Sequence, residues 1–271
     1  MVVVLGGGLV VGAVVAVLAL REGLGPEQTL KFLVSPEVSP LMTSPTWIAV
    51  GIAVNEVLVA IMLVLWLRRY QPPRRDVLPL RVPPLRGLGG ALLVVAGLTP
   101  AAELAGEVVY RLAPSELSAE AMVIAIARDV SVPGLVGVLL AAAVLPALIE
   151  EALFRGIITR AFMKRSQAVA VFIPSLMFGA FHLEPTQAAG TFVLGLGFGL
   201  ARLHTGSVLT SMICHFIYNS VVILRVHFGA RVGDHELHFG QVGLGLAITA
   251  FGYVLFLSVP ARRSLLPPRL G

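Results

Sequence analysis

Three apolar stretches of the chain contain side chains that can perform acid–base chemistry. Glu150 and Glu151 are adjacent, His182 ends a second apolar stretch, and His215 and Asn219 lie four residues apart in a third. A carboxylate in surroundings of low dielectric is a stronger base than in water, so a glutamate there can take a proton from a water molecule. An imidazole can orient that water, and imidazole and amide N–H groups can face a developing oxyanion. These residue types suit hydrolysis of an amide bond.

The same side chains also permit a metal-based reading. Glu150, His182 and His215 could instead hold a divalent metal such as zinc together with its bound water, because imidazole and carboxylate are normal zinc ligands. Either arrangement can hydrolyse an amide, and the residues alone leave the choice between them open.

The predicted depth of these side chains in the membrane is the main argument for one shared site. Counted along the helices from the ends of the predicted spans, Glu150 lies roughly 20 Å deep and His182 roughly 21 Å deep. On the same count His215 and Asn219 lie roughly 12 and 18 Å deep. Polar groups inside a membrane are costly, and unrelated ones have no reason to share a depth. The sequence therefore predicts that Glu150, His182, His215 and Asn219 line one polar cavity.

Helical spacing assigns supporting roles to neighbouring residues. Glu151 and Arg155 are four residues apart, in the order that favours an intrahelical ion pair. Glu150 lies about 100° round the same helix and is free to face another partner. Phe178 and His182 share a helix face, so the phenyl ring is expected to wall the pocket around the imidazole.

Composition defines the elements that must position these residues. Of 271 residues, 57% are hydrophobic and only 13% are charged, and the mean hydropathy is +0.91. These values indicate an all-α, polytopic transmembrane helical bundle that forms a single membrane domain over residues 1–271. Gly195 and Gly199 are expected to permit close helix packing. About 20 apolar residues cross a bilayer as a helix, which predicts about eight spans: 2–20, 46–67, 87–106, 133–162, 168–183, 188–203, 207–225 and 239–259.

The basic residues indicate an orientation and not a nucleic-acid partner. No stripe of Lys and Arg is interleaved with aromatic residues, so nucleic-acid binding is not expected. With a cytosolic N-terminus, most Lys and Arg fall on the cytosolic side, as the positive-inside rule requires. We expect a multi-pass protein of the cell (inner) membrane with both termini cytosolic. The basic residues that this orientation places on the non-cytosolic side are Arg21, Lys31, Arg111, Arg128, Arg225 and Arg231.

The three segments resemble the motifs of the CAAX-processing and bacteriocin-processing (CPBP, Abi-type) intramembrane proteases. Two glutamates followed after three residues by arginine are found at 150–155. Phe-x-x-x-His is found at 178–182, and His-x-x-x-Asn at 215–219. Each motif alone is weak, but all three occur in order on apolar segments. The resemblance covers about residues 141–223, which would be the catalytic core.

The resemblance implies roles and partners. Glu150 would activate the attacking water with the help of His182, while His215 and Asn219 would stabilise the oxyanion. Glu151 and Arg155 would support the site. The substrate would be a membrane-anchored or lipidated protein or peptide, cut near its terminus, and removal of a C-terminal tail in the myxosortase branch is one candidate process. The family is called a metalloprotease family, yet these residues do not decide whether a metal is needed.

Other polar residues are interpreted as structural. Glu56 and Glu103 have no partners at matching depth, so packing or the lining of a polar cavity is favoured over catalysis. Residues 234–238, Asp-His-Glu-Leu-His, lack the His spacing of a zinc helix and are expected in a solvated loop. Cys214 directly precedes His215, so the two side chains point to different faces of the helix, and Cys214 is not expected to act as a nucleophile paired with His215. The alternatives from other classes are a proton-coupled transporter, although no repeats are visible, and a membrane scaffold without catalysis.

Overall fold

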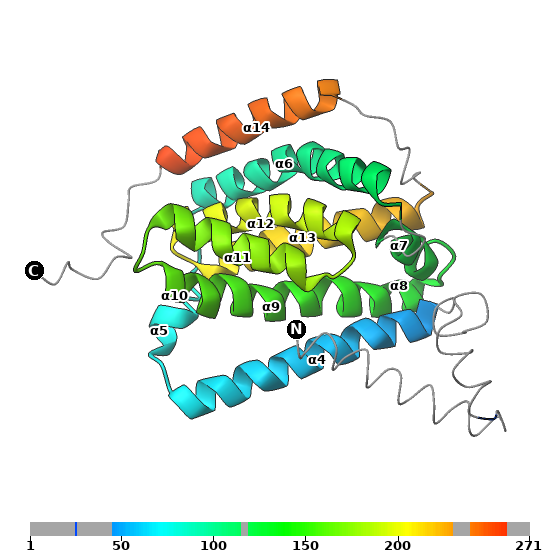
Figure 1. Ribbon diagram of the computed structural model, residues 1–271, viewed down its shortest axis with the longest axis horizontal. Coiled ribbons are helices and arrows are strands. Elements are labelled where there is room, and N and C mark those ends of the chain that lie inside the picture. The colour runs from blue at the N-terminus through cyan, green and yellow to red at the C-terminus, as the bar shows by residue number, and fades with distance from the viewer. Residues whose placement is uncertain (1–24, 26–44, 115–118, 230–238, 259–271) are drawn as a thin grey trace, which may run out of the picture.

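The described part of the protein is helical and contains no strand. The computed structural model describes residues 25, 45–114, 119–229 and 239–258 (Figure 1). A long helix, Val132–Phe162, holds the first motif. The other helices are α4 (Pro45–Tyr70), α5 (Arg74–Val77), α6 (Leu85–Leu112), α7 (Ala119–Ala127), α11 (Gln167–Phe181), α12 (Pro185–Thr205), α13 (Val208–His227) and α14 (Phe239–Leu257).

Five of the described helices are long and apolar enough to cross a membrane, so the expected count of about eight is not confirmed. They are Ile48–Tyr70, Leu85–Leu112, Val132–Phe162, Val208–His227 and Phe239–Leu257. The first predicted span, 2–20, lies outside the described residues, as does the segment 234–238 that is expected in a solvated loop. The predicted spans 168–183 and 188–203 correspond to α11 and α12, and α11 is an apolar helix of less than full membrane length.

The helices pack in successive layers that place α12 and α13 inside the bundle (Figure 1). Helix α14 packs on α6, α6 packs on α12, and α12 packs on α11 and α13. On the other side, α13 contacts the long helix, which in turn contacts α4. At Gly97 of α6 and Gly245 of α14 the two backbones leave no room for a side chain. Small residues allow this close approach where no hydrophobic force draws membrane helices together.

The long helix is continuous but contains two π-helical segments between its α-helical parts. Pro146 lies inside it and has no N–H to donate, so the α-helical hydrogen-bond ladder must adjust there. The segment just before this proline and the segment just after Glu151 are π-helical. Such segments often mark functional positions in helices. In order, the helix consists of α8 (Val132–Leu139), η1 (Leu140–Val144), α9 (Leu145–Glu151), η2 (Ala152–Ile158) and α10 (Thr159–Phe162).

Candidate active site

The centre of the candidate site is a buried ion pair joined by a histidine. Oε1 of Glu151 accepts hydrogen bonds from Nη1 of Arg155 at 3.0 Å and from Nδ1 of His215 at 3.1 Å. Glu151 and Arg155 are fully buried, and His215 is 4% exposed. The predicted Glu151–Arg155 pair is therefore present, and it also fixes a ring that belongs to a different helix.

Arg155 ties the long helix to α12. Its Nη2 donates to the backbone oxygen of Gly195 at 3.0 Å. Its guanidinium carbon lies 4.5 Å from the ring centre of Phe178 and 5.4 Å from that of Phe198. A Cβ atom at Gly195 would lie 3.0 Å from this Nη2. A Cβ atom at Gly199 would lie 2.9 Å from Val171 of α11, so the close packing predicted for both glycines is confirmed.

Asn219 sets the protonation pattern of His215. Its Nδ2 donates to the backbone oxygen of Ala142 at 3.0 Å and lies 3.2 Å from Nε2 of His215. In an α-helix the Ala142 carbonyl would accept from residue 146, but Pro146 has no N–H. Because Nδ2 is a donor, Nε2 must accept from it, so the ring proton is on Nδ1 and faces Glu151.

Glu150 lies nearest to Nε2 of His215, the ring nitrogen that also faces Asn219. Its Oε2 is 3.9 Å from Nε2 of His215, and the carboxyl group of Glu56 from α4 lies close enough to act on it electrostatically. Glu56 and Glu150 are 2% and 6% exposed. The expectation that Glu56 has no partner at matching depth is therefore wrong, because α4 packs on α9 beside Glu150. Glu103 lies on α6 with its side chain exposed.

His182 joins the cluster through an aromatic ring. Its Nδ1 bonds the backbone oxygen of Phe178 at 2.9 Å, so it carries the proton and leaves the lone pair on Nε2. The ring of Phe178 meets the ring of His182 edge-on at 5.0 Å and that of His215 at 5.8 Å. Phe178 thus packs against His182, as its spacing predicted, and also against His215, which the spacing did not predict. Glu150, His215 and Asn219 form a connected group, and His182 lies against the same phenyl ring as His215.

The three candidate metal ligands do not fit a metal site in this arrangement. No three His, Cys, Asp or Glu side chains among the described residues are grouped closely enough to hold a metal ion. Of the candidates Glu150, His182 and His215, the last has both ring nitrogens in hydrogen bonds, to Glu151 and Asn219. A metal ligand needs a ring nitrogen with a free lone pair, and His215 has none in this arrangement.

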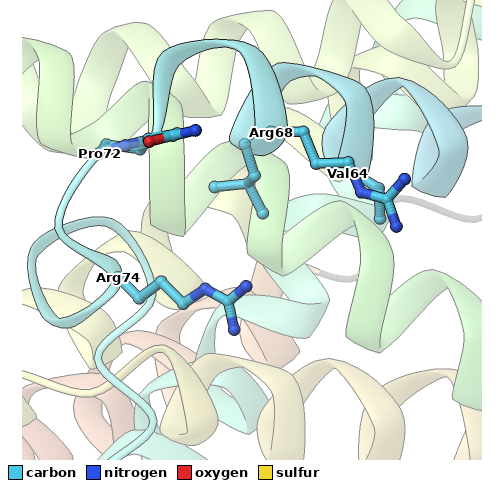
Figure 2. Close-up of a pocket in the computed structure, with 6 residues that line it drawn as sticks. Val64, Arg68, Pro72 and Arg74 are labelled. Carbon is cyan, nitrogen blue, oxygen red and sulfur yellow. The ribbon is translucent and has the colours of Figure 1, made fainter.

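A pocket of about 550 Å³ lies elsewhere, at the end of α4 (Figure 2). Figure 2 shows Val64 and Arg68 on α4, Arg74 at the start of α5, and Pro72 in the link between the two helices. None of the predicted catalytic residues lines this pocket. Its complete lining is Val64, Leu67, Arg68, Gln71, Pro72 and Arg74.

Three residues of the site were not predicted as members of it. Glu56 gave a partial signal, as a charge inside an apolar stretch. Phe198 stacks on His215 with ring centres 4.9 Å apart, but one phenylalanine in an apolar helix gives no signal. Ala142 takes part only through its backbone oxygen, and its role follows from a proline four residues later.

Comparison with known proteins gives one finding for this region. Residues 132–221 match the family model described as type II CAAX prenyl endopeptidase Rce1-like. No curated protein and no solved structure matches the chain. The matched segment spans less than half of the chain, contains all three motifs, and does not distinguish a myxosortase branch. The match supports the resemblance to CAAX-processing proteases and assigns an Rce1-like domain to the part of the fold that carries the cluster.

Proposed function

We propose that this protein is an intramembrane endopeptidase that hydrolyses a peptide bond near the terminus of a lipidated or otherwise membrane-anchored protein. The observation that carries the proposal is the contact between two helices distant in sequence. Glu150 of α9 and His215 of α13 lie 3.9 Å apart in the interior, with His215 held by Glu151 and Asn219. The Rce1-like match and the five apolar helices support the same activity.

Glu150 is the proposed general base. It takes a proton from a water molecule, and Nε2 of His182 accepts a hydrogen bond from the same water and orients it. The water oxygen then forms a bond to the carbonyl carbon of the substrate, and the carbonyl π electrons move to its oxygen. Glu150 returns the proton to the amine nitrogen as the C–N bond breaks. The products are a carboxylic acid and an amine.

Asn219 and His215 are the proposed stabilisers of the oxyanion. In the substrate-free structure both hydrogens of the Asn219 amide are used, one by Ala142 and one by His215. A substrate carbonyl oxygen would take the second hydrogen in place of Nε2 of His215. Nε2 of His215 would join Asn219 as a donor to that oxygen by taking up the proton that Glu150, 3.9 Å away, has removed from the water, and would return it to Glu150 before the C–N bond breaks. Glu151 would compensate the positive charge meanwhile.

Glu151 and Arg155 are proposed positioning residues. Neither side chain is exposed, so they act on the reaction through His215 and through the α12 backbone at Gly195. A buried ion pair is a weak source of stability but a strong constraint on geometry once its hydrogen bonds are made.

The proposed substrate is a prenylated protein, as the description of the matched family suggests. Removal of a C-terminal anchoring tail, as in the myxosortase branch, is the second candidate within the same chemistry. We propose that the protein is a multi-pass protein of the cell (inner) membrane with both termini cytosolic. With this orientation most Lys and Arg residues lie at the cytosolic ends of the predicted spans, as the positive-inside rule requires.

Cleavage of a defined reporter tests this function. The full chain is reconstituted in liposomes with a fluorogenic peptide that ends in a farnesylated cysteine followed by three residues. We expect cleavage by the natural sequence and a loss of at least about 100-fold in kcat for Glu150→Gln. The matched control is Glu103→Gln, an exposed glutamate of α6, which should keep full activity. Cleavage by Glu150→Gln at the normal rate would remove Glu150 as the base, and ion flux without cleavage would favour a transporter.

A further inference from the structure

A buried arginine outside the candidate active site has no partner among the described residues. Arg202, near the end of α12, is 1% exposed. Its Nε and Nη1 make no hydrogen bond with any described residue. A buried charge is normally paired, so an unpaired guanidinium indicates that its counter-ion comes from outside the described chain.

Two other arginines act electrostatically on Arg202 and increase this imbalance. They are Arg81 and Arg160, which are both positive. Arg81 is exposed, and Arg160 is one-quarter exposed and lies 3.4 Å from Asp76, which is itself half-exposed. Asp76 therefore pairs with Arg160, and no described carboxylate pairs with Arg202.

The backbone holds these arginines together. Oγ of Ser207, one turn after Arg202, donates to the backbone oxygen of Arg81 at 2.5 Å. The N–H of Val208 donates to the backbone oxygen of Pro79 at 3.0 Å. These bonds fix the segment that carries Arg81 against the junction of α12 and α13. Earlier in the same segment, Val77 and Leu78 pack on Gly156, one turn before Arg160.

We propose that Arg202, Arg81 and Arg160 form a binding site for a phosphate-bearing anion at the basic end of the bundle. The arginines stand where α10, α12 and the segment before α6 meet, which is the end of the bundle that also carries α5 and the last turn of α4 (Figure 1). Basic pockets between membrane helices on one side of the bilayer bind lipid headgroups, and arginine forks match phosphate oxygens. This site is independent of the proposed protease activity.

Two sources can supply this chemistry, and the test separates them. Purified full-chain protein in detergent micelles is titrated with dioleoyl phosphatidylglycerol, with zwitterionic dioleoyl phosphatidylcholine, and with inorganic phosphate. Bound lipid is counted by native mass spectrometry, and Tm is followed in parallel. Saturable binding of phosphatidylglycerol alone identifies a lipid headgroup site. Binding of inorganic phosphate as well identifies a site for soluble phosphate groups. Absence of saturable binding of both overturns the proposal.

Variants locate the site. Arg81→Ala, at an exposed position that should not affect folding, is expected to weaken binding about fivefold, the contribution of one arginine near a charged surface. The matched control is Arg74→Ala in the pocket of Figure 2, which should bind normally. Arg202→Met should lose binding and, without an anion, should show a Tm equal to or above that of the natural sequence, because it removes an unpaired buried charge. An Arg74→Ala loss as large as that of Arg81→Ala would contradict the proposal.

Discussion

Nδ2 of Asn219 lies 3.2 Å from Nε2 of His215 and donates a hydrogen bond to it. The same amide donates to the Ala142 carbonyl, four residues before Pro146, so the orientation of Asn219 depends on a proline in another helix. One amide therefore holds His215 in the tautomer whose proton faces Glu151.

Replacing this amide should affect catalysis far more than stability. For Asn219→Ala we expect kcat to fall by about 10²–10³, the loss typical of one oxyanion donor, while KM changes little. The control is Ser220→Ala, the next residue of α13, whose buried hydroxyl has no partner among the described residues and whose removal should be silent. Equal losses in both variants would mean that α13 is simply sensitive to substitution.

Breaking the buried ion pair should be more damaging than removing it. Arg155→Met leaves Glu151 as an unpaired buried charge and should lower the free energy of unfolding by about 3–5 kcal/mol. The double variant Glu151→Leu with Arg155→Met should recover most of that stability, because no charge remains, but should stay inactive since His215 loses its anchor. Thermal unfolding in detergent and the cleavage assay measure the two effects. A double variant that is active would show that the pair does not position His215.

Gly195 should not tolerate even one methyl group. A Cβ there would lie 3.0 Å from Nη2 of Arg155 and 3.1 Å from Cβ of Ser175. Gly195→Ala is therefore expected to cost about 1–3 kcal/mol and to lower activity by displacing Arg155. Gly137→Ala is the matched control, because an added Cβ at this helical glycine meets no atom within 4 Å. The control should be neutral or slightly more stable.

Glu56 should influence the reaction through Glu150. Both carboxyl groups are buried and act on each other electrostatically, so a change at Glu56 should change how readily Glu150 takes a proton. Glu56→Gln keeps a hydrogen-bonding side chain, so its kcat should stay within about tenfold of that of the natural sequence. Glu56→Leu should lower kcat further, but by less than the roughly 10⁴-fold expected from removal of a general base. Equal activity of the Gln and Leu variants would assign Glu56 to packing alone.

Chelation should leave cleavage unchanged. Both ring nitrogens of His215 are already in hydrogen bonds, and the described residues include no group of three metal ligands. The full chain is dialysed against EDTA, its metal content is measured by mass spectrometry, and cleavage is assayed before and after zinc is added. Loss of activity on dialysis and recovery with zinc would require His215 or Asn219 to rearrange and would replace the water-only mechanism.

Local sequence determined much of the fold and the chemistry of the site. Hydrophobic length predicted α4, α6, the long helix, α13 and α14 to within a few residues, except that α6 runs on to Leu112. The cost of polar groups in lipid marked Glu150, His182, His215 and Asn219. Helical spacing predicted the Glu151–Arg155 pair, which needs only one helix to form.

Only the tertiary structure decided which groups from different helices meet. The pairing of Glu56 with Glu150 depends on α4 packing against α9, and the stacking of Phe198 on His215 depends on the rotation of α12. Neither relation has a fixed spacing in the sequence. The role of Asn219 depends on a carbonyl that Pro146 leaves without its usual donor, which is a backbone effect across two helices. Periodicity reports one helix at a time, whereas these contacts are set by how whole helices pack.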